Sequence, residues 1–169
     1  MTRLRPLCLV SVILSLGVST AMAQSSLRDQ ILPRSECFFG LHFDLHPGAT
    51  DTVLGKEASA ENIRALLART DPDFVQYDCK GHAGYTGYPT EVGWSSPGIV
   101  RDALPVWRQV TREFGTGLYI HYSGVWDSVA VQHHPGWAVV GPDGTVDTNH
   151  TSLFGPYVDE LLIPQVKEV

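Results

Sequence analysis

The sequence has few cysteines, no excess of basic residues, and no long hydrophobic run after its first 23 residues. It contains three cysteines, 12 lysines and arginines against 18 acidic residues, and a formal net charge of −6. So few cysteines exclude a small fold held together by a dense disulfide framework. The acidic balance argues against nucleic acid and anionic membranes as partners. A neutral ligand such as a sugar is compatible with this charge.

The first 23 residues have the pattern of a secretory signal peptide. Arg3 and Arg5 precede an apolar stretch at residues 7–17, and an Ala-Met-Ala cleavage site ends at Ala23. The apolar stretch is too short to span a bilayer as a mature helix. We therefore predict a secreted or periplasmic protein with no membrane contact after cleavage. Removal of this segment takes away two of the 12 basic residues and no acidic one, which makes the mature chain more acidic still.

Cys37 and Cys79 are the cysteines that remain in the predicted mature chain. Export would permit a disulfide between them. The strand assignment given below places them at opposite ends of neighbouring strands, about 20 Å apart at about 3.3 Å per residue. A disulfide requires Cα atoms within about 7 Å of each other. We therefore predict two buried, unpaired cysteines.

The mature chain alternates between strand-like and helix-like segments. Strand-like segments cover residues 36–46, 73–82 and 117–123, and helix-like segments cover residues 59–70, 102–114 and 152–169. Ser59 is the predicted N-cap of the first helix, and Pro164 should kink or interrupt the last one. This order predicts parallel strands joined by helical crossovers, which is an α/β fold.

Each predicted strand has one apolar face and one polar face. In the second strand, Val75, Tyr77 and Cys79 alternate with Asp78 and Lys80, and side chains alternate faces along a strand. A doubly wound sheet is covered by helices on both faces and would be apolar on both. No Gly-x-Gly-x-x-Gly follows the first strand, which further disfavours a dinucleotide-binding fold. One polar face is typical of a (β/α)8 TIM barrel, where the inner face near the strand C-termini lines the active site.

The loops that leave the strand C-termini are long and those that return to the strands are short, as in (β/α)8 enzymes. The long loops cover residues 47–58, 83–101 and 124–151. A full barrel takes roughly 250 residues. Residues 37–169 are therefore predicted to form its first three βα units, after a lead-in at residues 24–36. A smaller open α/β domain is the alternative. Three units would leave strand edges free, and self-association through these edges is expected.

Polar side chains gather at the predicted C-terminal ends of the strands and in the loops that follow. The candidate substrate-binding residues are His42, Asp44, Asp78, Lys80, His82, Tyr85, His121, Tyr122, Trp126 and Asp127. Carboxylates and imidazoles bond sugar hydroxyls and aromatic rings offer stacking faces, so we predict a carbohydrate substrate, with no cofactor and no metal. The alternative is a structural salt bridge of Lys80 with Asp44 or Asp78. Unpaired buried charges are expensive, which argues against a purely structural role for the whole set.

His42, Asp44 and His46 also have the spacing of metal ligands on one strand face. They would support a metal-dependent hydrolase on the same barrel, with zinc or another divalent ion, although Lys80 would repel the cation. A non-catalytic sugar-binding module is a third interpretation. The His-His pair before Pro135 is predicted to lie in an exposed loop.

Three stretches of the sequence resemble the α-L-fucosidases and a related hypothetical glycosyl hydrolase family with a (β/α)8 barrel. Phe39 and Gly40 stand where the fucosidase pattern has Phe-Gly at its first strand. KGHAGY, residues 80–85, is similar to their KHHDGF after the second strand. YIHYSGVWD, residues 119–127, is similar to the stretch after their third strand. The resemblance covers residues 37–169.

The resemblance implies a glycosidase that acts on a neutral or deoxy sugar. It implies that Lys80 and His82 line the sugar subsite and that Trp126 forms its wall. It also implies a nucleophilic aspartate at the end of a fourth strand, beyond Val169, so the chain is expected to be a fragment that is inactive alone. A glycine replaces the first histidine of KHHDGF and an alanine replaces its aspartate. These departures favour the wider glycosidase superfamily over fucose specificity.

Overall fold

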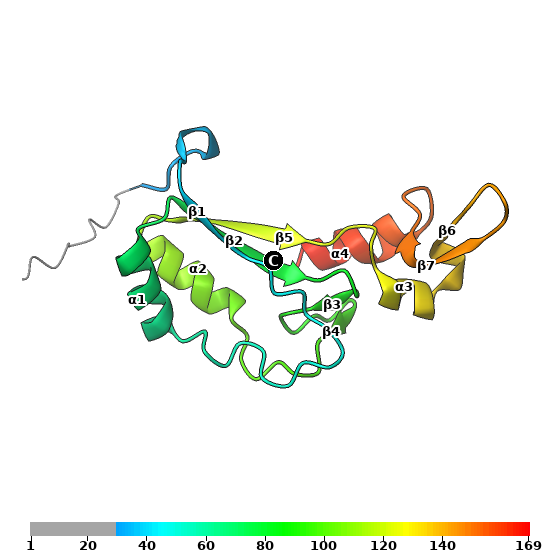
Figure 1. Ribbon diagram of the computed structural model, residues 1–169, viewed down its shortest axis with the longest axis horizontal. Helices are drawn as coiled ribbons and strands as arrows, with labels where there is room; N and C mark the ends of the chain where they lie inside the picture. The colour runs from blue at the N-terminus through cyan, green and yellow to red at the C-terminus, as the bar shows by residue number, and fades with distance from the viewer. Residues whose placement is uncertain (1–29) are drawn as a thin grey trace, which may run out of the picture.

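Three parallel strands form the centre of the computed structural model, which describes residues 30–169 (Figure 1). The strands are β1 (Gly40–Phe43), β2 (Phe74–Lys80) and β5 (Gly117–Tyr122). β2 lies in the middle and pairs in parallel with β1 on one side and with β5 on the other. The α/β class and the parallel strands predicted from the sequence are therefore confirmed. The predicted signal peptide lies outside the described residues.

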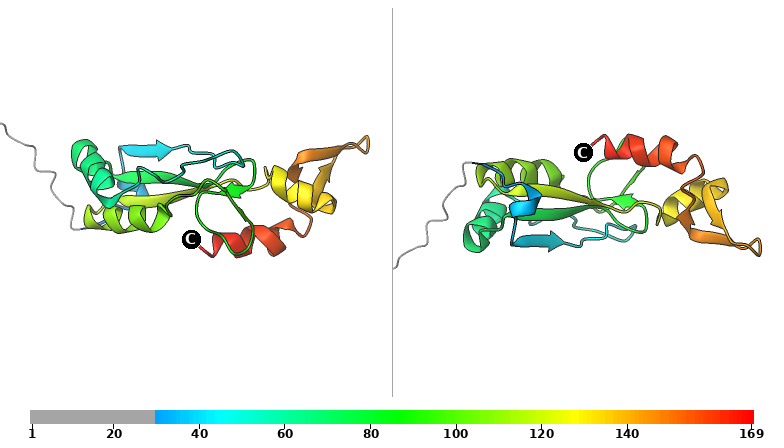
Figure 2. Two further views of the ribbon diagram at one scale, coloured as in Figure 1. Left: turned by 90° about the horizontal axis from the view of Figure 1, so that it is seen from below. Right: turned by 90° about the horizontal axis from the view of Figure 1, so that it is seen from above.

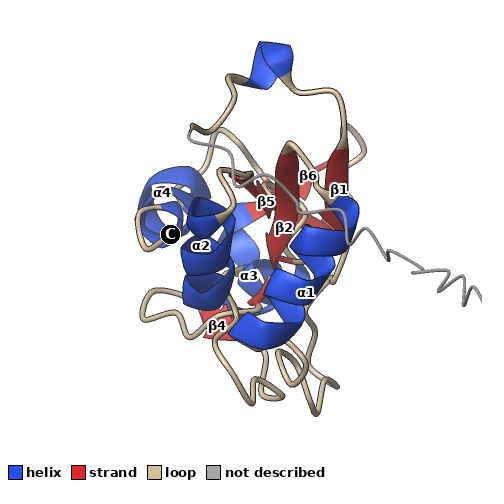
Figure 3. Ribbon diagram, turned by 90° about the vertical axis from the view of Figure 1, so that its left-hand side faces the viewer, coloured by secondary structure: helices blue, strands red, loops and turns tan. Residues whose placement is uncertain are grey.

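Two helices connect these strands and pack on one face of the sheet. They are α1 (Ala60–Thr70) and α2 (Leu104–Glu113), which lie side by side (Figure 3). Both helices share one hydrophobic core with β2, and its buried members include Ile63, Leu67, Val75, Tyr77, Cys79, Trp107 and Val110. The three β2 residues in this core are those that the alternating pattern assigned to the apolar face. Because both helices lie on the same face, the sheet is not doubly wound.

The ends of these elements are fixed by local hydrogen bonds. The Ser59 hydroxyl accepts a hydrogen bond from the Asn62 amide at 3.1 Å, so the predicted N-cap is confirmed. At the N-terminal end of β2, the Asp73 carboxylate accepts two hydrogen bonds of 2.7 Å, from the amides of Phe38 and Phe39. The Asp73 carbonyl accepts another from Gly117 at 2.9 Å. Asp73 therefore ties the start of β2 to the starts of β1 and β5.

The first strand is shorter than predicted, and the last helix begins later. η1 (Arg34–Glu36) is a 3-10 turn, and the chain leaves the sheet after Phe43, so β1 does not cover residues 36–46. The last helical segment consists of η3 (Val158–Leu162), which is π-helical, and α4 (Ile163–Val166). The change of helix type falls next to Pro164, which has no amide hydrogen to donate. Pro164 lies inside α4, so the helix changes type beside the proline but is not broken there.

The long segments after β2 and β5 contain structure that the sequence did not predict. β3 (Tyr85–Thr86) and β4 (Trp94–Ser95) pair with each other after β2. Residues 124–151 fold into α3 (Ser128–His133), η2 (Pro135–Trp137), β6 (Ala138–Val140) and β7 (Val146–Thr151). We call these four elements the outer lobe. It lies beyond the C-terminal end of β5, at the far end of the molecule from α1 (Figure 2).

Both cysteines of the described residues are free, as predicted. Cys79 is buried in the core, whereas Cys37 is partly exposed, so the expected burial of Cys37 is wrong. Cys37 precedes β1 instead of lying inside it. None of the helices in residues 30–169 is both long and apolar enough to cross a membrane.

The buried cysteine thiol and tyrosine hydroxyls of the core should make the stability of the fold sensitive to alkaline pH. Burial raises the pKa of Cys79 from 9.0 to about 12, and it also raises the pKa values of Tyr77, Tyr88 and Tyr122. Stabilisation from a raised pKa is complete below the unfolded-state pKa and is lost as the pH rises through the folded-state pKa. For Cys79 this window runs from pH 9.0 to about 12. We expect the urea midpoint to fall across this window, less steeply in Cys79→Ala. A constant midpoint would contradict the burial of these groups.

Candidate functional site

The C-terminal ends of β1, β2 and β5 bring several polar side chains to one edge of the sheet. The strand register places Phe43 beside Tyr77 and Asp78 beside His121. Asp44 follows β1 directly, at the level of Asp78 on the neighbouring strand. Parallel pairing thus gathers residues that lie far apart in the sequence.

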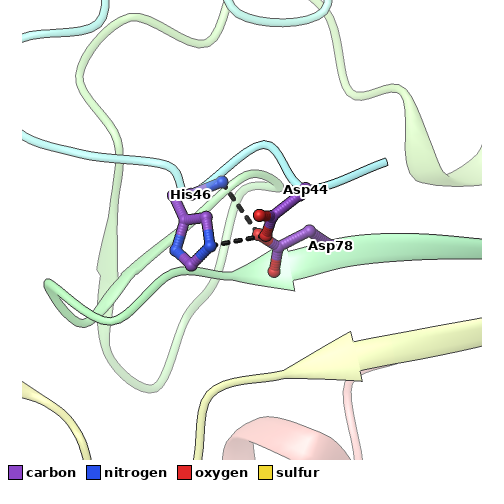
Figure 4. A group of neighbouring side chains, drawn as sticks. All are labelled: Asp44, His46 and Asp78. Atoms are coloured by element: carbon purple, nitrogen blue, oxygen red, sulfur yellow. Dashed lines mark hydrogen bonds and ion pairs between the residues drawn. The ribbon is translucent and has the colours of Figure 1, made fainter. Parts of the chain in front are cut away.

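Asp78 is the centre of this group. Its carboxylate is completely buried. One oxygen accepts a hydrogen bond from the His46 amide at 2.8 Å, and the other lies 3.0 Å from His121 Nδ1. His46 Nε2 lies 2.5 Å from the exposed carboxylate of Asp44. Figure 4 shows Asp44, His46 and Asp78 facing one another near the C-terminal end of β2.

His46 reaches this position through an unusual backbone conformation. Its φ is +42°, in the left-handed region that few non-glycine residues adopt. Gly81 makes room for it, because a Cβ at Gly81 would lie 2.8 Å from the His46 carbonyl carbon and 3.0 Å from the Pro47 nitrogen. The alternation of side chains between the two faces of β1 ends with the strand at Phe43, so His46 does not continue it. His42 stays on the exposed strand face, where its ring lies 5.9 Å from that of His121.

A second group, built on His82 and Trp126, adjoins the first. His82 Nδ1 lies 3.0 Å from the Ser123 hydroxyl. The His82 ring stacks on the Trp126 indole, with a centroid distance of 4.3 Å and an interplanar angle of 11°. The centre of the His46 ring lies 4.5 Å from that of His82. Trp126 is 45% exposed. A half-exposed indole thus lies against the His82 imidazole, and the ring of His150 lies 5.1 Å from it.

Lys80 and Asp127 are not accessible to a ligand in this structure. Both side chains are fully buried and their charged atoms lie 2.5 Å apart. The Tyr157 hydroxyl joins them, 2.9 Å from Lys80 Nζ and 3.0 Å from Asp127 Oδ2. The other Asp127 oxygen caps α3 by accepting from the Ala130 amide. We call Lys80, Asp127 and Tyr157 the buried triad. It joins β2, the outer lobe and the last helical segment.

A β-bulge explains why Lys80 does not join Asp78. The register between β2 and β5 shifts between these two residues, so Lys80 lies opposite Tyr122. Its ammonium nitrogen lies 5.5 Å from the centre of the Tyr122 ring. Burial lowers the pKa of Lys80, and the charge of Asp127 opposes that shift. The sequence suggested a salt bridge between Lys80 and Asp44 or Asp78. Lys80 forms it with Asp127 instead.

The remaining candidates lie outside the group around Asp78. Tyr122 packs against the hydrophobic core on the helix side of the sheet, and its hydroxyl lies 3.2 Å from that of Tyr88. Tyr85 lies in β3 beside Trp94 of β4. Trp94 stacks on His133, whose imidazole covers one face of the indole. His133 and its neighbour are exposed, as expected, but His133 ends α3 and does not lie in a loop.

Sequence reasoning did not include Tyr157 or Ser123 in the site, and it considered His46 only as a metal ligand. No local pattern marks Tyr157, which contacts Lys80 across 77 residues. Ser123 was assigned to the polar face of the third strand, which was the available signal. It directly follows β5 and supports both His82 and the Trp126 carbonyl.

A groove of about 790 Å³ lies elsewhere, beside β1 and α1. Its lining is largely apolar and includes Phe43, Leu45, Leu66 and Trp107. None of the ten predicted substrate-binding residues lines it. The polar group at the strand ends therefore lies outside this groove.

The fold is similar to part of a solved structure, alpha-L-fucosidase isoenzyme 2 from Paenibacillus thiaminolyticus. The TM-score is 0.69 and the sequence identity is 22%. The match covers 79% of this chain but only 21% of the fucosidase, so the chain spans a small part of that protein's length. No protein-family model and no curated protein matches the sequence. The match therefore shows a similar fold.

Proposed function

We propose that this chain is the first part of a glycoside hydrolase-like (β/α)8 barrel that acts on a neutral or deoxy sugar. Its sugar subsite lies at the C-terminal ends of β1, β2 and β5. The observation that carries the proposal is the half-exposed indole of Trp126, stacked on His82, whose ring lies 4.5 Å from that of His46. An indole face packs against the C–H surface of a sugar, while carboxylates and imidazoles bond its hydroxyls. The similar fold of part of an α-L-fucosidase supports this proposal.

The strand order supports completion of a barrel by further βα units. β1, β2 and β5 follow one another in a single direction, with α1 and α2 on one face. Within residues 30–169, β1 and β5 each pair only with β2, so each has a free edge. Without such units, the free edges favour association between copies of the chain.

The described residues bind sugar in this proposal, and the nucleophile comes from beyond Val169. Asp78 is unsuited to nucleophilic attack, because its carboxylate is completely buried and both of its oxygens are hydrogen-bonded. Asp127 is buried in a salt bridge. Glycosidases need two carboxylates facing the scissile bond. The chain is therefore proposed to bind sugar without hydrolysing it, after export through the predicted signal peptide.

Sugar binding by the mature chain tests this proposal. We would titrate it with L-fucose, D-galactose and D-xylose in the presence of EDTA and follow tryptophan fluorescence and calorimetric heat. We expect saturable binding of at least one sugar. Trp126→Ala should weaken it about two- to tenfold, because an aromatic contact contributes about 0.5–1.5 kcal/mol.

Trp94→Ala is the matched control, because Trp94 also stacks on a histidine but lies outside the polar group. It should bind sugar as the unmodified chain does. Equal affinities of the unmodified chain and Trp126→Ala, or no binding of any of the three sugars, would overturn the proposed subsite. Binding by this chain without hydrolysis by any longer polypeptide would favour a non-catalytic sugar-binding module.

A further inference from the structure

Three side chains of metal-binding type converge near the C-terminal ends of β1 and β2 (Figure 4). Asp44, His46 and Asp78 each present one ligand atom, and these atoms all lie within 4.8 Å of one another. We propose that these residues bind one divalent transition-metal ion, Zn²⁺ or Mn²⁺. This set differs from the one that the sequence suggested, because Asp78 from β2 replaces His42. The sugar interpretation of the sequence expected no metal here.

The charge at this position favours a cation. The Asp78 carboxylate is completely buried. In the described part of the chain no lysine or arginine forms an ion pair with it, and its ion-pair partner is the imidazole of His121. The nearby ammonium of Lys80 is turned away and neutralised by Asp127. The repulsion expected from Lys80 is therefore removed. Two carboxylates and a neutral imidazole would balance the charge of a divalent ion.

The ligands are held in place by their neighbours. The His46 amide and His121 Nδ1 contact one Asp78 oxygen each, at 2.8 and 3.0 Å. Such contacts orient a metal-binding carboxylate in the way that outer-shell partners do in known sites. The Cβ-free Gly81 lets the His46 backbone approach β2. Binding would replace the direct contact of His46 with Asp44 by a metal bond to each residue.

The ligand types identify the class of metal. A nitrogen ligand with two carboxylates suits Zn²⁺ or Mn²⁺ better than Ca²⁺ or Mg²⁺, which prefer oxygen ligands alone. Three protein ligands leave at least one coordination position open for water or another oxygen. The His46 ring lies 4.5 Å from that of His82, which stacks on Trp126. A hydroxyl of a ligand on Trp126 could therefore fill the open position.

Calorimetry tests the proposal. The untagged chain is stripped of metal with EDTA, the EDTA is removed, and the chain is titrated with ZnCl₂ and, separately, with MnCl₂. We expect one site per chain for at least one of the two ions. Asp44→Asn and His46→Gln should each weaken binding at least about tenfold, because even outer-shell changes cost about 10–100-fold. Asp44 has 61% of its side chain exposed, so Asp44→Asn should fold normally.

Asp147→Asn is the matched control. Asp147 and His150 form another half-exposed pair at 3.0 Å, but they have no third ligand within the described residues. This variant should bind the metal as the unmodified chain does. Absence of saturable binding, or equal affinity in the unmodified chain, Asp44→Asn and His46→Gln, would overturn the site. The sugar titration is done in EDTA, without metal, and the metal titration is done without sugar. A failure of the proposed sugar subsite can therefore be told apart from a failure of the metal site.

Discussion

Replacing Lys80 by methionine is expected to destabilise the fold by about 3–5 kcal/mol, because the change leaves a buried carboxylate without its cation. The Lys80 ammonium lies 2.5 Å from the Asp127 carboxylate, and both side chains are fully buried. Asp127 also caps α3, and Tyr157 contacts both charged groups. Loss of the ammonium therefore weakens the attachment of the outer lobe and the last helical segment to β2. Urea unfolding followed by circular dichroism measures the loss.

Arg64→Met is the matched control for this change. The ion pair of Arg64 with Glu113 has a similar length of 2.7 Å, but its side chains are 44% and 37% exposed. Exposed pairs contribute about 0–1 kcal/mol, so this variant should unfold close to the unmodified chain. Equal losses in the two variants would contradict the burial of the triad.

The double change Lys80→Met with Asp127→Asn keeps the prediction testable even where the single variant does not fold. Asparagine is neutral and can still cap α3. No uncompensated charge then remains beside β2, so part of the lost stability should return. A double variant that is less stable than Lys80→Met would show that Asp127 does not need the ammonium.

The position of Asp78 could be predicted from the sequence, and the position of Lys80 could not. Alternation along β2 correctly separated Val75 and Tyr77 from Asp78, and parallel pairing placed Asp78 beside His121. The same alternation fails for Lys80, because the register shift between Asp78 and Lys80 pairs Lys80 with Tyr122 and directs its ammonium to Asp127. A bulge inserts one residue and has no signature of its own in an alternating pattern.

Contacts across long sequence separations set the rest of the site. His46 leaves the expected strand face because its backbone turns at a positive φ against Gly81, which lies on another strand's loop. The two-residue strands β3 and β4 are too short to show any periodicity. The partner of Lys80 lies 47 residues away, at the start of an outer lobe that looked like an unstructured loop. Its identity depends on how that lobe folds and not on the residues around Lys80.

Gly84→Ala should be the second most damaging change, with an expected loss of at least about 3 kcal/mol from strain and overlap together. Gly84 has a φ of +100°, which a side chain tolerates poorly. A Cβ there would overlap Asp127 Oδ1 and would lie 2.9 Å from Asp127 Cγ and 3.2 Å from Val129 Cβ. Asp127 cannot retreat, because it is bonded to Lys80 and caps α3. The variant therefore forces the outer lobe away from β2.

Gly144→Ala separates the two causes of this loss. Gly144 has a similar φ of +84°, but a Cβ there meets nothing within 4 Å. It should lose only about 1 kcal/mol, the cost of the backbone strain alone. The difference between the two urea midpoints then measures the packing of Gly84 on Asp127. Similar losses of stability in both variants would mean that the outer lobe can move away from β2 at little cost in free energy. In that case the stacking of Trp126 on His82 would not be held by the buried triad.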